Sequence, residues 1–151
     1  VRDIVRNISQ GVKDIGLTGK KVSVIDERSE IGACFNGVPQ LNVGVRTDIL
    51  DGCPKSQGII MAIRSMSPEV IVCDEIGTYK DMDSIVTALN SGISLIITIH
   101  GYGIEDLYNR PVFKIVENKV FNRGIVLSNR KGAGTVEYIY DFPKNSVIWR
   151  G

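Results

Sequence analysis

Apolar residues along this chain follow two different spacings. In some segments they recur every three or four positions, which predicts helices with one buried face. Other segments are short, nearly continuous apolar runs rich in β-branched residues, which predict strands buried on both faces of a sheet. The expected helices span residues 1–10, 53–66 and 79–91, and the expected strands span residues 21–26, 69–74 and 92–100. Because helices and strands alternate, we expect an α/β fold with a mostly parallel sheet flanked by helices.

The remaining segments are shorter or more polar. Residues 120–128 and 135–141 alternate between apolar and polar positions around a polar turn, which predicts an antiparallel hairpin at the edge of the sheet. The other expected features are a turn at residues 16–20, a mainly irregular stretch at 29–52, and short helices near 104–108 and 111–118.

Length and composition indicate one globular domain with a hydrophobic core. The chain has 151 residues, of which 43% are hydrophobic and 23% charged, and its formal net charge is +1. This charge provides no strong field toward nucleic acid or anionic lipid. The longest strongly apolar stretch, residues 92–99, is too short to span a bilayer, so we expect no transmembrane segment. A basic stretch between Arg110 and Lys131 fits either a solvated face or a docking surface for a partner or a membrane.

The cysteines indicate a reducing compartment. Cys34, Cys53 and Cys73 are odd in number and widely spaced, which argues against a disulfide framework and against a zinc site. Cys73 lies inside an apolar run, so we expect it in the core. The pattern fits a cytoplasmic protein.

The strand expected at residues 69–74 carries the strongest chemical signal. Four apolar residues are followed by Asp74 and Glu75, which is the Walker B pattern. Open α/β sheets place ligands at the carboxyl ends of their strands, where an Asp is suited to hold Mg²⁺ through water. A Glu beside it is suited to orient the water that attacks a γ-phosphate. A buried strand that ends in exposed acids at a turn has the same pattern.

Two other expected strands also end in polar groups. Residues 21–26 lead into Asp26, Glu27 and Arg28, and residues 92–100 end in Thr98 and His100. We expect all these groups at one edge of one sheet, facing a nucleotide. The Thr98 hydroxyl or a neutral His100 imidazole is suited to sense the γ-phosphate or position water. A lone histidine is also commonly structural, and without further ligands it is not expected to bind metal.

The phosphate-binding loop that such a site requires is missing from this sequence. No segment matches G-x-x-x-x-G-K-[ST], whose backbone amides would hold phosphates at a helix N-terminus. Residues 1–10 form a helix pattern with no capping residue before it, so we expect the loop to precede Val1 in a longer protein. We therefore interpret the chain as a fragment that does not bind ATP with useful affinity by itself.

Four segments together resemble the family of stage III sporulation AA proteins, over essentially the whole chain. They are residues 2–6 (RDIVR), 24–31 (VIDERSEI), 64–77 (RSMSPEVIVCDEIG) and 98–101 (TIHG). That family is similar to the motor ATPases of type II and type IV secretion and pilus systems. The resemblance implies a RecA-like P-loop ATPase core, a single domain over residues 1–151, from the C-terminal part of a longer protein with a further N-terminal domain.

The resemblance also implies cofactors, partners and a location. The cofactors are ATP and Mg²⁺, with Asp74 as the metal-binding residue. The protein would form a homo-oligomeric ring, expected to be a hexamer, and act with membrane-embedded proteins of the sporulation channel. It would lie on the cytoplasmic, mother-cell side, peripheral to the membrane, and drive export or assembly of a conduit between mother cell and forespore.

Individual residues receive roles from the same resemblance. Asp74 and Glu75 match the Walker B pair. The implied catalytic residues are Glu27, Glu75 and His100, and the implied nucleotide-binding residues are Asp26, Arg28, Arg46, Arg64 and Asp74. Arg28 and Arg46 are candidates to reach a phosphate across a subunit boundary, although a surface salt bridge explains either equally well. The sequence departs from many secretion motors at Gly77 and Thr78, where they carry Arg-Asp, so no contact is transferred to that pair.

Two other functions fit parts of the sequence. A catalytically degenerate scaffold of the same complex predicts that no phosphate-binding loop is encoded before Val1. A nucleic-acid-dependent RecA-like motor is disfavoured by the near-neutral charge and the few aromatic residues, so we expect no nucleic-acid partner.

Overall fold

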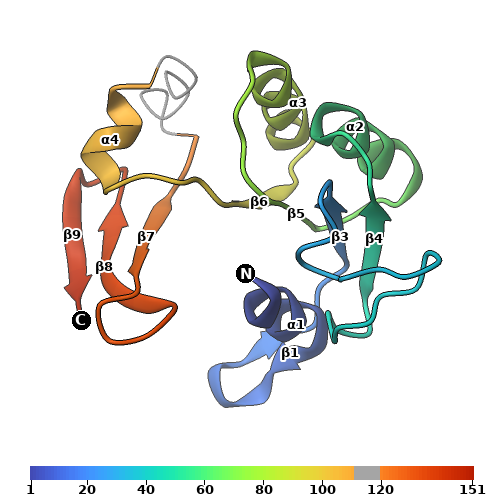
Figure 1. The fold of residues 1–151 in the computed structure, drawn as a ribbon, viewed down its shortest axis with the longest axis horizontal. Coiled ribbons are helices and arrows are strands. Elements are labelled where there is room, and N and C mark those ends of the chain that lie inside the picture. Colours follow the sequence, from blue (N-terminus) through green and yellow to red (C-terminus); the bar gives the residue numbers. More distant parts are fainter. Residues whose placement is uncertain (111–119) are drawn as a thin grey trace. The chain divides into compact units, whose positions relative to one another are not determined.

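Four parallel strands form the main sheet of the computed structural model, in the order β4-β3-β5-β6 (Figure 1). They are β3 (Val22–Asp26), β4 (Thr47–Asp51), β5 (Val70–Cys73) and β6 (Ser94–Ile97). All three pairings are parallel, which confirms the expected mostly parallel sheet. The prediction that residues 29–52 are mainly irregular is wrong for β4. Its residues are half-buried or exposed, so its sequence carries little of the apolar pattern that reveals an inner strand.

Three helices lie against this sheet, as expected: α1 (Arg2–Gln10), α2 (Lys55–Ser65) and α3 (Tyr79–Asn90). Pro54 directly precedes α2, where its missing amide hydrogen costs no helix hydrogen bond. A capping box starts α3. The Asp81 amide donates to the Thr78 hydroxyl, and the Thr78 amide donates to the Asp81 carboxylate.

The helices cover opposite faces of the sheet. Val22 and Val24 of β3 share a core cluster with Val5 of α1. Ile25 points to the opposite face of β3 and lies against Gly58 of α2, and α3 packs beside α2 (Figure 1). A Cβ atom at Gly58 would approach Cγ2 of Ile25 to 2.6 Å, so the close approach of α2 to the sheet requires glycine at this position.

The prediction that residues 92–100 form a strand buried on both faces is wrong in its burial. β6 is the last strand in the sheet order, with Ser94 exposed and the next three residues half-buried. In contrast, every residue of the inner strands β3 and β5 is buried. A short apolar run therefore indicated a strand correctly but not its position in the sheet.

A second sheet is formed by the C-terminal segment. It is antiparallel, in the order β7-β8-β9, and the same segment contains a short helix, α4. Their bounds are α4 (Ile104–Tyr108), β7 (Arg123–Ser128), β8 (Thr135–Asp141) and β9 (Ser146–Arg150). The expected helix and hairpin are confirmed. The placement of the hairpin at the edge of the main sheet is wrong, because β8 pairs with β9 on its other side and the three strands form a separate sheet.

The structure describes residues 1–110 and 120–151, and the helix expected near 111–118 lies outside them. These residues form two compact units, Val1–Ile99 and His100–Gly151. The expectation that residues 1–151 form a single domain stays a prediction. A small hairpin of β1 (Gly11–Val12), η1 (Lys13–Ile15) and β2 (Leu17–Thr18) follows α1, near the turn expected at 16–20. Within residues 1–110 and 120–151, no helix is both long and apolar enough to cross a bilayer.

Candidate functional site

The parallel register brings polar residues from several elements to one edge of the main sheet. Asp26, the last residue of β3, pairs with Asp51, the last residue of β4. β5 and β6 end in register with them, so Asp74 and Thr98, which follow these strands, lie at the same edge. This is the carboxyl edge, where parallel α/β sheets carry their ligand-binding groups.

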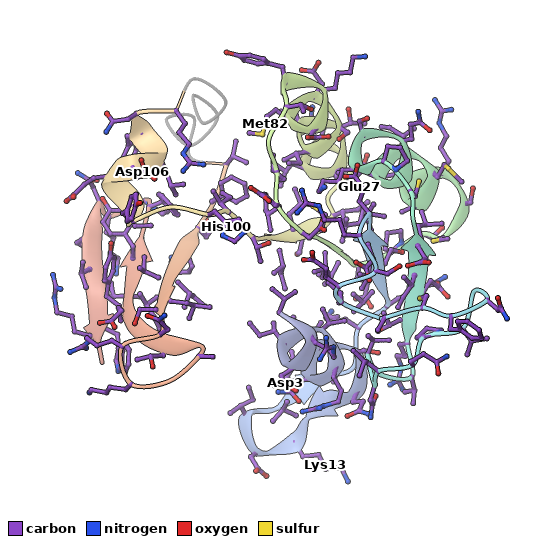
Figure 2. All side chains as sticks on the ribbon, in the orientation of Figure 1. Asp3, Lys13, Glu27, Met82, His100 and Asp106 are labelled. Atoms are coloured by element: carbon purple, nitrogen blue, oxygen red, sulfur yellow. The ribbon has the colours of Figure 1, made fainter. Side chains whose placement is uncertain are left out.

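Lys55, the first residue of α2, bridges two of the acids at this edge. Its Nζ atom contacts Oε2 of Glu27 and lies 3.1 Å from Oδ1 of Asp74 (Figure 2 labels Glu27). The Lys55 side chain is 8% exposed and that of Asp74 11%, whereas Glu27 is 42% exposed. A lysine is rarely this deeply buried unless it is paired, so the two carboxylates account for its position.

The charge state of Lys55 follows from these contacts. Burial alone lowers the pKa of Lys55, but its hydrogen bond to Glu27 and the attraction of the Asp74 and Glu27 carboxylates outweigh burial and raise this pKa above its ordinary value. The side chain is therefore an ammonium at neutral pH. Glu27 and Asp74 come from different strand ends, so this ammonium links β3, β5 and α2 at the candidate site.

A pocket of about 350 Å³ lies beside Asp74. Its lining consists of the start of α1, a loop that follows β3, and the ends of β5 and β6. The residues are Val1, Arg2, Asp3, Glu30, Ile31, Asp74 and Thr98. Within the described part of the chain, Oδ1 of Asp74 is buried and receives no hydrogen bond. Its contact with Lys55 is close enough for an ion pair, but its direction does not suit a hydrogen bond.

Asp26 serves a different purpose from its neighbour Glu27. Its side chain is fully buried and accepts hydrogen bonds from three backbone amides. The Glu30 amide donates to Oδ1 at 2.9 Å, and the Ile31 and Gly32 amides donate to Oδ2 at 3.0 and 2.8 Å. The carboxylate therefore holds the loop that forms one wall of the pocket. Asp26 does not line the pocket itself and affects it only by fixing this loop.

Glu75 and Arg28 lie more openly at the same edge. A guanidinium nitrogen of Arg28 is 3.9 Å from Oε2 of Glu75, and the two side chains are 63% and 41% exposed. An ion pair this long and this exposed contributes little to stability. Both groups are accessible to a ligand from solvent, which suits the nucleotide-related roles expected for them.

The structure does not bring Arg46 and Arg64 to this edge of their own chain. Arg46 precedes β4, at the amino edge of the sheet, where it donates to the Ser9 carbonyl. Arg64 lies in the last turn of α2, which runs from the carboxyl edge at Lys55 toward the opposite edge. Met66, which directly follows α2, contacts Ser23 near the start of β3, so this end of the helix lies at the amino edge of the sheet. The nucleotide-binding role expected for Arg64 stays a prediction, as does a contact between Arg46 and a phosphate on a neighbouring subunit.

His100 is the first residue of the second unit, so its expected convergence with Asp74 and Glu75 stays a prediction. Thr98, two residues earlier, belongs to the first unit and lines the pocket with Asp74. The Thr98 backbone also continues the sheet, because its amide donates to the Cys73 carbonyl at 3.4 Å.

Lys55 is not among the site residues expected from the sequence. A lysine that follows Cys-Pro at the start of a helix has no motif of its own. A topological signal was available, however. In a β-α-β unit the helix begins at the same sheet edge at which the strands end, so the first residues of α2 necessarily lie near Asp74.

Comparison with known proteins gives a family match over almost the whole chain. Residues 1–147 match the family described as sporulation stage III, protein AA. The chain is 47% identical over 142 residues to stage III sporulation protein AA of Bacillus subtilis (strain 168). That alignment covers 93% of this chain and 46% of the Bacillus protein.

More distant relatives have different names. The chain is 32% identical over 113 residues to the uncharacterized protein ycf45 of Porphyra purpurea, covering 74% of this chain and 19% of that protein. It is 29% identical over 99 residues to the protein SEEDLING PLASTID DEVELOPMENT 1 of Arabidopsis thaliana, covering 64% and 14% of the two chains. The chain thus spans less than half the length of each of these relatives.

Proposed function

Because the chain belongs to the sporulation stage III protein AA family, we propose that it is the core of an ATP-hydrolysing motor subunit that acts in sporulation. The complete protein hydrolyses ATP with Mg²⁺ and uses the resulting motion to drive export or assembly across the membranes between mother cell and forespore. The core has a RecA-like P-loop fold. The family match supports the role in sporulation, and the Walker B pattern together with the parallel sheet supports the ATPase.

The pocket at the start of α1 is the observation that carries this proposal. The first amides of a helix lack partners within the helix and carry partial positive charge, a setting that binds phosphate. In this structure that helix end shares a pocket with Asp74 and Thr98. Arg2 adds a cationic group to the same lining. The proposal therefore includes a phosphate-binding loop N-terminal to α1 in the complete protein.

Asp74 fits the magnesium ion that this reaction requires. Its Oδ1 atom is buried beside the pocket and receives no hydrogen bond within the described part of the chain. No three His, Cys, Asp or Glu side chains among residues 1–110 and 120–151 form a metal cluster. One carboxylate, water and phosphate oxygens are a common ligand set for Mg²⁺. When bound, Mg²⁺ supplies charge neutralisation on the phosphates.

The neighbouring side chains have distinct tasks in this reaction. Glu75, half-exposed and next to Asp74, orients the attacking water and accepts its proton. Glu27 is held at the same edge by Lys55 and supports that water from the other side. The Thr98 hydroxyl, in the pocket lining, donates to the γ-phosphate. His100, by the family resemblance, assists at the same phosphate.

Assembly and location extend the proposal. The complete protein forms a homo-oligomeric ring, expected to be a hexamer, on the mother-cell side of membrane-embedded channel proteins. Arg46 and Arg64 lie at the sheet edge opposite Asp74 and so serve a neighbouring subunit. An arginine supplied in trans stabilises the charge that develops on a transferred phosphoryl group.

A Glu75→Gln substitution in the complete protein tests the proposal. ATP binding and phosphate release are measured for the wild type, for Glu75→Gln, and for a matched control, Asp83→Asn, an exposed carboxylate on α3. We expect Glu75→Gln to bind ATP normally and to hydrolyse it at least about 100-fold more slowly, because general base catalysis is lost. The control should retain wild-type turnover.

Two results would contradict the proposed ATPase function. Wild-type turnover by Glu75→Gln would remove Glu75 from its assigned role. A complete wild-type protein that binds no ATP and releases no phosphate would replace the motor with a scaffold of the same complex.

A further inference from the structure

Lys55 holds Glu27 in the reaction outlined above, but that reaction does not use its second contact, with Asp74. It is the first residue of α2, its side chain is 8% exposed, and its ammonium contacts one carboxylate from each of two strand ends. The proposed magnesium ligand, Asp74, is one of these partners. The following argument rests on the proposed function, because it concerns the same metal position.

The two contacts of Lys55 are unequal. The ammonium makes a close, hydrogen-bonded contact with Oε2 of Glu27. Its contact with Oδ1 of Asp74 is an ion pair at 3.1 Å, and that oxygen receives no hydrogen bond within residues 1–110 and 120–151. Attraction between opposite charges alone therefore connects Lys55 with Asp74. Such a contact can be exchanged for another cation without leaving a buried donor unpaired, because Glu27 still holds the ammonium.

A divalent cation bound to Asp74 would repel the ammonium of Lys55, because Lys55 lies close to the same carboxylate. Two like charges a few ångströms apart in a partly buried site interact by several times the thermal energy, and a double charge doubles the effect. The long, flexible stem of a lysine allows its head group to move while its backbone stays in place. Glu27, at 42% exposure, offers a partner that lies closer to solvent than Asp74.

We propose that the Lys55 ammonium occupies the cation position of Asp74 while no divalent metal is bound, and that metal binding displaces it toward Glu27. Lys55 is thus a positioning residue. It neutralises the acidic edge in the nucleotide-free protein and weakens metal binding in the absence of nucleotide. The metal then enters together with the nucleotide phosphates, whose negative charge offsets the repulsion from Lys55.

Titration of the complete protein with Mn²⁺, without any nucleotide, tests this exchange. Free Mn²⁺ is followed by electron paramagnetic resonance for the wild type, for Lys55→Gln and for Lys20→Gln. Lys20 is a matched control, because its Nζ atom lies 2.7 Å from Glu69 in an exposed lysine–glutamate pair. We expect Lys55→Gln to bind Mn²⁺ at least about tenfold more tightly than the wild type, because a competing charge is removed. Lys20→Gln should match the wild type.

Equal or weaker Mn²⁺ binding by folded Lys55→Gln would overturn the proposal, since a purely structural ion pair does not compete with metal. If that variant does not fold, the wild type supplies the answer through acetylation of lysines, mapped by mass spectrometry with and without Mn²⁺. We expect Lys55 to react several times faster with Mn²⁺ present, while Lys20 keeps its rate. An unchanged Lys55 rate would refute the exchange.

The outcome is separable from that of the proposed function. The titration contains no ATP, so a protein that hydrolyses ATP but shows no effect of Lys55 on Mn²⁺ binding removes only the exchange. A protein that shows the tighter binding but hydrolyses no ATP keeps the metal exchange and loses the motor.

Discussion

Replacing Asp26 with asparagine tests whether this residue shapes the pocket through its loop. The carboxylate accepts three backbone hydrogen bonds, two at Oδ2 and one at Oδ1, and its side chain is fully buried. An asparagine oxygen can keep the two bonds from Ile31 and Gly32. Its NH₂ group then faces the amide of Glu30, donor against donor. Losing one charge-assisted bond and leaving one buried donor unpaired costs about 3 kcal/mol in the free energy of unfolding.

Urea denaturation, followed by far-ultraviolet circular dichroism, measures this cost. Asp48→Asn is the matched control, because Asp48 is an exposed carboxylate on the adjacent strand β4. We expect a change below about 0.5 kcal/mol for the control, as is usual for exposed positions. If Asp26→Asn were as stable as Asp48→Asn, the three amide bonds would not hold the loop. A direct role for Asp26 at the nucleotide would then become the better explanation.

Burial raises the pKa of Cys73 to about 12, whereas the thiol of an unfolded chain keeps its ordinary pKa of 9.0. Between these values the folded state binds more protons, so wild-type stability should fall by about 1.4 kcal/mol per pH unit relative to Cys73→Ala, measured by urea denaturation from pH 8 upward. Removing the α3 capping box with Thr78→Ala should cost about 1 kcal/mol in the same assay at pH 7. Mixing inactive Arg64→Ala and Glu75→Gln subunits of the complete protein should restore roughly a quarter of wild-type ATPase by random pairing across interfaces, whereas no restoration would exclude Arg64 as the arginine supplied in trans.

The inner part of the fold was predictable because buried elements carry recognisable apolar patterns in the sequence. β5 is buried on both faces, and its four apolar residues therefore stand in an unbroken run. α3 carries both a periodic apolar face and a capping box within its own sequence. β4 has neither mark, since its residues are half-buried or exposed and only its pairing with β3 defines it. β9 likewise depends on β8 for its definition. Pairing partners are a tertiary property, and local patterns do not contain them.

Some residues of the candidate site were likewise predictable from local sequence patterns, and others were not. Asp74, Glu75 and Thr98 were found because strand ends are visible in the sequence and a parallel sheet collects them at one edge. The fully buried environment of Asp26 was not foreseeable, because its three amide partners come from a turn without a recognisable motif. Arg46 and Arg64 were assigned from a family pattern in which distance along the chain says nothing about the sheet edge on which they lie.

The position of Lys55 can be explained only from the arrangement of several elements of the fold, not from its local sequence. A cation at the first position of a helix is unfavourable, because it meets the positive end of the helix dipole. Burying it there adds a desolvation cost. Local preferences alone would therefore place an acidic residue at this position, and the structure resolves the conflict only through Glu27 and Asp74, which come from two other elements. Departures from local preference concentrate at functional sites, where another element of the fold provides the compensation. A buried lysine at a helix start, next to the carboxyl ends of parallel strands, is thus itself a reason to look for a cation site in a sequence that lacks its phosphate-binding motif.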